Sequence, residues 1–260
     1  MPQTSIAYNP KGVQITFEEE SHTYETDLVN NFTSSSGIIH EFFPQFDPVE
    51  VSNRIAAKKG TTPEALRQEW EDNKNTACTY GTRVHEVAEY HFTGKPHLNH
   101  QPQNEKEFKT FQVAQQAVNM LKSQFQLIGC ELIVFSERFR IAGTMDLLMW
   151  DPATQSVLIL DWKTNKEIKQ SAYQNETGYA PLQHIQNCNY EHYALQLGVY
   201  QFLMEQEGYY PPGTKYRRAL IHITPDGPQW YELQDRQKEV AQMILYHRIR
   251  PLEEYDYVPF

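Results

Sequence analysis

The sequence lacks several features that would place the protein in a membrane or outside the cell. No run of about 18 apolar residues occurs among its 260 residues, so no membrane span is expected. The opening residues, MPQTSIAYNPKG, contain no apolar core of a secretory signal. The three cysteines, Cys78, Cys130 and Cys188, are odd in number and far apart, which is typical of reduced thiols. We therefore expect a cytoplasmic protein.

Other absences narrow the class of protein. No G-x-x-x-x-G-K-[ST] sequence is present, which excludes a P-loop motor, and no internal repeat is visible. The formal net charge of −10 argues against broad, non-specific binding of nucleic acid. It leaves room for a local basic groove around a cluster of carboxylates. With 40% hydrophobic residues, the chain can bury the core of a single α/β domain.

Capping and turn signals predict helices in the first half and strands after it. Asp47-Pro48 and Thr62-Pro63 each pair a capping residue with a proline at the first helical position. Besides a hairpin at residues 13–24, we expect helices at 47–59, 62–74, 79–92, 104–126, 189–208 and 235–247, and strands at 131–135, 141–150, 157–162, 216–224 and 229–233. This order predicts a central mixed sheet flanked by helices, with a helical N-terminal portion packed on it.

Two neighbouring strands carry charged residues inside apolar runs. Asp146 lies in GTMDLL, and Asp161 and Lys163 end the run LILDWKT. Residues two apart in a strand share a face, so Asp161 and Lys163 point together while Trp162 points the opposite way. If the strands pair, Asp146 and Asp161 approach each other, and a divalent cation would relieve their repulsion. A simple ion pair at the end of a strand is the alternative for Asp161 and Lys163.

The combination of patterns is similar to the PD-(D/E)XK nuclease superfamily. GTMD followed by LILDWKT carries the resemblance, together with GTRVHE in the preceding helix and QLGVY in the following one. Within the superfamily it resembles the RecB-like exonuclease branch. The ordered residues are His85, Asp146, Asp161, Lys163, Gln196 and Tyr200.

The resemblance implies a restriction-endonuclease-like αβββαβ core with a helical N-terminal elaboration. It implies one domain over residues 1–260, with a hairpin and helices at about 1–126, a catalytic core at about 80–224 and a last strand and helix at about 228–250. His85, Asp146, Asp161 and the carbonyl of Trp162 would bind Mg²⁺ or Mn²⁺. Lys163 would be the catalytic lysine, and Gln196 and Tyr200 would orient DNA.

Further residues have weaker support. Glu89 lies one turn after His85, and Glu137 matches an acid often found before the GTMD strand. The basic residues that could contact phosphates, with solvated charge as an equal alternative, are Arg83, Arg138, Arg140, Lys166 and Lys169. Because no cysteine follows Cys188, the four-thiolate iron–sulfur cluster of some relatives is not expected.

The expected function is a stand-alone, metal-dependent DNA exonuclease in replication, recombination or repair, in a bacterium or a phage-infected host cell. A structure-specific or restriction-like endonuclease is one alternative. A DNA-binding subunit without activity is another. A helicase, a single-strand annealing protein or a replication protein could be a partner.

Overall fold

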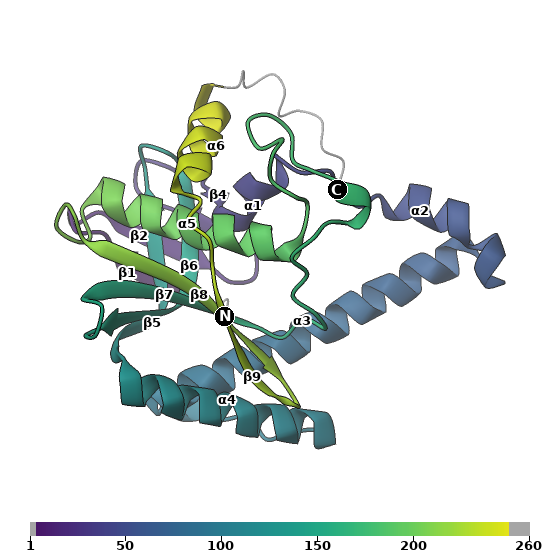
Figure 1. Cartoon of the computed structure of the whole chain (residues 1–260), viewed down its shortest axis with the longest axis horizontal. Helices are drawn as coiled ribbons and strands as arrows, with labels where there is room; N and C mark the ends of the chain where they lie inside the picture. The colour runs from purple at the N-terminus through teal and green to yellow at the C-terminus, as the bar shows by residue number, and fades with distance from the viewer. Residues whose placement is uncertain (1–3, 250–260) are drawn as a thin grey trace.

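A six-stranded mixed sheet forms the centre of the computed structural model, which describes residues 4–249 (Figure 1). The strands are β4 (Thr33–Ser34), β5 (Gln126–Ser136), β6 (Ile141–Asp151), β7 (Ser156–Lys163), β8 (Lys215–Thr224) and β9 (Gly227–Glu232). Their order is β4-β6-β7-β8-β9, and β5 pairs antiparallel along β6. The β7–β8 pair is parallel, because helix α5 (Asn189–Glu207) connects the two strands.

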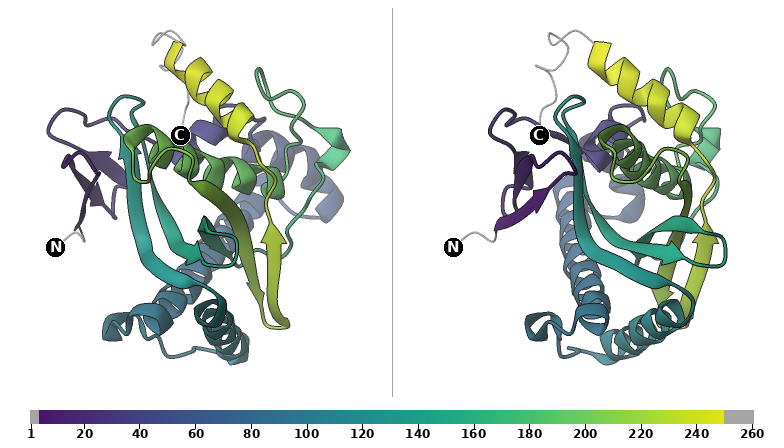
Figure 2. Two further views of the ribbon diagram at one scale, coloured as in Figure 1. Left: turned by 60° about the vertical axis from the view of Figure 1, so that its left-hand side comes forward. Right: turned by 90° about the vertical axis from the view of Figure 1, so that its left-hand side faces the viewer.

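Helices cover both faces of this sheet (Figures 1 and 2). On one face, α3 (Pro63–Thr93) and α4 (Glu105–Gln124) pack on a buried cluster that includes Leu147, Leu160 and Trp162. The opposite face carries α1 (Ser35–His40), α5 and α6 (Gln237–Ile249). The remaining helices are α2 (Pro48–Ile55) and the 3₁₀ turns η1 (Ala57–Lys59), η2 (Pro96–Leu98) and η3 (Tyr173–Asn175). No described helix is both long and apolar enough to cross a membrane.

A separate three-stranded sheet lies at the N-terminus. It consists of β1 (Thr4–Tyr8), β2 (Gln14–Glu18) and β3 (Thr23–Glu25) in antiparallel order. Ile15 and Tyr24 pack against Phe135 and Ala142 on the β5–β6 hairpin, so this small sheet rests on the edge of the core (Figure 2).

Strand β6 is left partly unpaired on the edge that faces β7. Strand β5 occupies one edge of β6 over its whole length. Both β4 and β7 therefore lie along the other edge: β4 pairs with Ile141 and Ala142, and β7 pairs from Leu147 onward. Residues 143–146 of β6 lie between these two partners. This interval, the β6 gap, positions the site described below.

The αβββαβ order predicted for the core is confirmed by the helices α3 and α4, strands β5 to β7, helix α5 and strand β8. Two element predictions were wrong. The helices expected at 62–74 and 79–92 form the single helix α3, because no proline interrupts them and Gly81 is accommodated inside the helix. Strand β5 begins at Gln126 rather than Glu131, and a register shift near Gly129 obscures its pattern. Residues 1–3 and 250–260 of the expected domain lie outside the described residues.

Candidate active site

Asp146 lies at the end of the β6 gap and reaches toward β7. Its Oδ2 accepts a hydrogen bond of 2.8 Å from the backbone N–H of Trp162. The β6–β7 ladder has ended at Leu147 and Leu160, so this carboxylate takes the place of the next ladder bond. In a strand the N–H and C=O of one residue point the same way. The carbonyl of Trp162 therefore also faces the gap.

Asp161 and Lys163 meet on the opposite face of β7 from Trp162, as the alternation predicted. Their carboxylate and ammonium form an ion pair. Burial, and then the charge of Asp146, raise the pKa of Asp161. Burial alone would lower the pKa of Lys163, but Asp161 and Asp146 outweigh it and raise that pKa, so the ammonium stays charged. Its Nζ also lies 4.3 Å from the centre of the Tyr193 ring, a cation–π contact.

Helix α3 brings His85 to the same place. Its Nδ1 lies 3.4 Å from Oδ2 of Asp146, and the side chains are 28% and 13% exposed. Two carboxylates and an imidazole from three elements thus surround one gap, which solvent reaches mainly on the side of His85.

The donor set, two carboxylates and an imidazole, fits a divalent cation. Oδ2 of Asp161 is buried, and the ammonium of Lys163 is its charged partner. A buried carboxylate beside Asp146 suits Mg²⁺ or Mn²⁺, which prefer oxygen ligands. As the side chains stand, no three His, Cys, Asp or Glu residues within 4–249 already form a ligand cluster.

Tyr200 of α5 packs under the β6 gap and contacts the backbone of β6 there. Its hydroxyl donates to the unpaired carbonyl of Thr144 at 2.9 Å and accepts from Nε2 of Gln196 at 2.9 Å and from Oγ of Ser35 at 3.2 Å. A Cβ at position 143 would lie 2.7 Å from Cε1 of Tyr200 and 2.6 Å from Oγ of Ser35, so only glycine fits there. The glycine of GTMD lets this tyrosine reach the strand.

A family model for the PD-(D/E)XK nuclease superfamily matches residues 58–256. The chain belongs to this superfamily. Among solved structures, a protein from Eubacterium rectale that is provisionally called an exonuclease is similar, with 15% identity, a TM-score of 0.44, and coverage of 88% of this chain and 90% of that one. A second, called SSO0001, has 15% identity, a TM-score of 0.23, and coverage of 64% and 86%. No curated protein sequence matches.

The acid of this PD-(D/E)XK chain that faces Asp146 is Glu131, which the sequence did not single out. Position 131 lies opposite Asp146 in the β5–β6 register. Although its side chain keeps contact with solvent, the protein packed around it, and then the charge of Asp146, raise the pKa of Glu131. The expectation for Glu137 is corrected: it lies at the β5–β6 turn, nine residues before Asp146, and accepts a hydrogen bond from Thr26.

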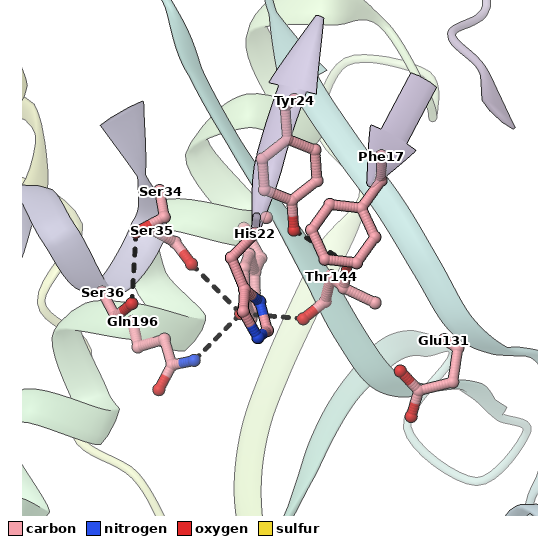
Figure 3. A pocket seen from close by; sticks show the side chains of 11 residues that line it. Phe17, His22, Tyr24, Ser34, Ser35, Ser36, Glu131, Thr144 and Gln196 are labelled. Atoms are coloured by element: carbon pink, nitrogen blue, oxygen red, sulfur yellow. Dashed lines mark hydrogen bonds between the residues drawn. The ribbon is translucent and has the colours of Figure 1, made fainter. Parts of the chain in front are cut away.

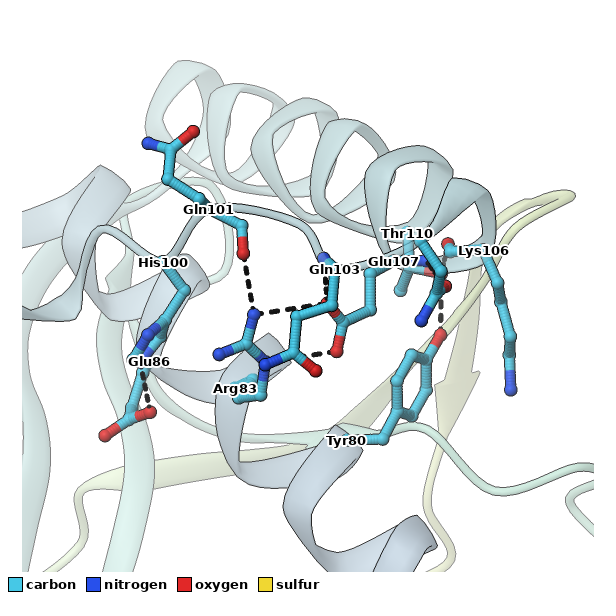
Figure 4. Close-up of polar contacts among 10 residues, drawn as sticks. Tyr80, Arg83, Glu86, His100, Gln101, Gln103, Lys106, Glu107 and Thr110 are labelled. Atoms are coloured by element: carbon cyan, nitrogen blue, oxygen red, sulfur yellow. Dashed lines mark hydrogen bonds and ion pairs between the residues drawn. The ribbon is translucent and has the colours of Figure 1, made fainter.

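Three other predicted residues have partners that change their interpretation. Tyr200, which we expected to orient DNA, is 2% exposed and bonded to the Thr144 carbonyl, so its effect on DNA would be transmitted through strand β6. Arg83 does not face solvent but binds Glu107 through two hydrogen bonds of 3.0 and 3.1 Å and the carbonyl of Gln101 (Figure 4). Glu89 pairs with Lys95 at 2.7 Å on the buried side of α3.

The remaining basic residues lie in two places. Arg138 and Arg140 are at the β5–β6 turn with Glu137, where Arg138 lies over the ring of Phe139. Lys166 and Lys169 are exposed on the segment that follows β7, a few residues beyond Lys163. Of these, the two lysines are on the chain segment that leaves the candidate site.

Proposed function

We propose that this chain is a metal-dependent DNA exonuclease. The observation that carries the proposal is a cluster of charged side chains at the β6 gap, where one edge of β6 has no partner strand. Strands β6 and β7 contribute Asp146, Asp161 and Lys163, and helix α3 contributes His85. Membership of the PD-(D/E)XK superfamily supports phosphodiester hydrolysis.

Each residue has a role that follows from its position. Asp146, Asp161, His85 and the carbonyl of Trp162 would hold Mg²⁺ or Mn²⁺, with Glu131 beside them as a further acid. The bound ion supplies charge neutralisation at the phosphate and a water made more acidic. Lys163, kept charged by its two acidic neighbours, would stabilise negative charge on the phosphate or orient the attacking water.

The DNA would approach across the half-exposed side of the gap. The amide of Gln196 lies at this side, and its contact with Tyr200 fixes its direction. Lys166 and Lys169 would contact phosphates on the way in. The net charge of −10 makes a bound cation important for association, because bare carboxylates repel the DNA backbone.

The decisive experiment compares Lys163→Ala and Asp161→Ala with wild type on end-labelled single- and double-stranded DNA, with Mg²⁺ or Mn²⁺. We expect both variants to lose cleavage. Lys109→Ala, which removes the same charge from an exposed position on α4, serves as the control and should retain full activity. Cleavage by both site variants at the wild-type rate would show that the assignment is wrong.

A closed circular DNA separates exonuclease from endonuclease. An exonuclease leaves the circle intact and degrades the same molecule once it is linearised. Cleavage of the circle would favour the structure-specific or restriction-like alternative. No cleavage and no Mn²⁺ binding by calorimetry would favour a DNA-binding subunit. Labels at the 5′ and 3′ ends report polarity.

A further inference from the structure

A pocket of about 400 Å³ lies beside the candidate metal site, and phosphodiester hydrolysis does not account for its aromatic wall (Figure 3). Phe17, His22 and Tyr24 line one side and come from β2, β3 and the turn between them. These residues precede 58–256, the range matched by the family model. The pocket therefore joins the nuclease core to a part of the chain outside that range.

The three rings form a continuous aromatic wall. Phe17 stacks on Tyr24 with centroids 4.5 Å apart and planes at 27°, and the His22 ring lies 5.8 Å from Phe17 at 56°. The Tyr24 hydroxyl is hydrogen-bonded to Oγ1 of Thr144 at 3.0 Å. That bond fixes the wall to strand β6, the strand that carries Asp146.

The opposite side of the pocket is polar but has little charge. Ser34 and Ser36 come from the start of α1, and Gln196 comes from α5 (Figure 3). Among the lining residues that the structure describes there is no lysine or arginine, and Glu131 is the one carboxylate. The described lining therefore offers no lysine or arginine to bind a phosphate. A flat, neutral group with hydrogen-bonding edges suits both sides.

The pocket is continuous with the candidate metal site. Thr144 lines it, and Asp146 follows two residues later on the same strand. Two residues of a strand span about 7 Å, which is within the length of one nucleotide. A base in the pocket and a phosphate at Asp146 can therefore belong to adjoining parts of one DNA strand.

We propose that this pocket binds an unpaired base next to the scissile phosphate, with the base against Phe17 and His22. The identity of the polymer as DNA rests on the proposed nuclease function. A base inside a duplex has both faces and its pairing edge covered, so it must leave the helix to enter. The substrate class is therefore single-stranded DNA or the unpaired end of a duplex.

The test uses single-stranded oligonucleotides that carry 2-aminopurine at one position at a time. They are bound with Mn²⁺ to the Lys163→Ala variant, and to the same variant with Phe17→Leu and His22→Ala added. We expect fluorescence quenching by stacking at one position in the first protein and its loss in the second. The Kd for single-stranded DNA should rise between about 5-fold and 150-fold.

The matched control is the Lys163→Ala variant with Phe108→Leu and His97→Ala added. These changes remove an exposed ring and an exposed imidazole on the α3–α4 side. It should leave quenching and Kd unchanged. Thermal unfolding checks that each variant is folded. If the variant with Phe17→Leu does not fold, His22→Ala alone is used in place of the double change. Absence of quenching at every position, or quenching and Kd unchanged by the pocket variants, overturns the pocket assignment.

The two proposals fail in different ways. If Lys163→Ala still cuts DNA but the pocket variants abolish quenching, the nuclease assignment fails and the pocket stands. If cleavage requires Lys163 while the pocket variants change neither quenching nor Kd, the nuclease assignment stands and the pocket fails.

Discussion

The side chains of three consecutive residues, Asp161, Trp162 and Lys163, lie on opposite faces of β7. Trp162 is buried in the cluster beneath α3 and α4, whereas Asp161 and Lys163 meet on the other face. Burial disfavours both charges: the acids outweigh it for Lys163, whereas Lys163 offsets it only in part for Asp161, whose pKa stays raised. The tryptophan anchors the strand, and this anchor fixes where the two charges lie.

Tyr200→Phe tests the positioning role of the tyrosine hydroxyl. The change leaves the Thr144 carbonyl and the Gln196 amide without their partner, at a cost of about 1–3 kcal/mol of stability. Because Thr144 lies two residues before Asp146, we expect kcat to fall about tenfold with little change in KM. Steady-state cleavage and urea unfolding measure the two effects.

Tyr190→Phe is the matched control for that variant. Tyr190 is a buried tyrosine on the same helix, and its hydroxyl donates to the Glu232 carbonyl at 3.1 Å, away from the β6 gap. It should lower stability but leave kcat unchanged. Equal losses of kcat in the two variants would show that Tyr200 acts through general stability alone.

At the level of elements, the sequence predicted what depends on neighbours along the chain. The alternation in LILDWKT correctly placed Asp161 and Lys163 on one face of β7, because strand periodicity is local. The short turn after Asp151 predicted the β6–β7 pairing that brings Asp146 near Trp162.

Non-local features could not be predicted in the same way. Glu131 faces Asp146 only because of the β5–β6 register, which the sequence does not show, and the irregular start of β5 hid it. Arg83 is two residues from His85 in sequence, but the direction of α3 points it toward α4 and Glu107. The hairpin at residues 13–24 was predicted, but its place against β6 was not, because β2 and β3 meet β6 through tertiary packing alone.

Arg83→Ala tests whether this arginine connects two helices. Arg83 on α3 is 14% exposed and its partner Glu107 on α4 is 5% exposed, so removing it leaves a buried carboxylate. We expect the free energy of unfolding to fall by about 2–4 kcal/mol, with unchanged DNA affinity per folded molecule. Urea unfolding and DNA titration measure these. Lys109→Ala, which breaks the exposed Lys109–Glu105 pair, should cost at most about 0.5 kcal/mol.

The Arg83–Glu107 ion pair should make the stability of the fold depend on pH. Burial alone would raise the pKa of Glu107, but hydrogen bonds from Arg83 and the Gln103 amide outweigh it and lower that pKa. A carboxyl with a lowered folded-state pKa stabilises the fold above its ordinary value near 4.5 and loses that contribution as the pH falls below it. The stability difference between wild type and Arg83→Ala should therefore shrink below pH 4.5. A constant difference down to the pKa of the folded state would contradict the assignment.

At the scale of the whole molecule, acidic groups from several elements gather around the β6 gap. Strands β5, β6 and β7 bring Glu131, Asp146 and Asp161 together, and the charge of Asp146 raises the pKa of both Glu131 and Asp161. The sheet, the helices on both faces and the N-terminal strands hold this arrangement against repulsion. A cation bound there should stabilise the whole fold.

Mn²⁺ should raise the Tm of the wild-type protein at neutral pH, because it binds the folded arrangement of carboxylates and not the unfolded chain. At 100 times its Kd the gain is about 2.7 kcal/mol. Asp146→Asn and Glu131→Gln should reduce the gain, since each replaces a carboxylate at the gap with an amide, which is a weaker ligand for the ion. Glu137→Gln, at the distant β5–β6 turn, should keep it in full. Differential scanning calorimetry with and without EDTA measures the shift. A gain lost in Glu137→Gln but kept in Glu131→Gln would place the metal at the turn and not at the β6 gap.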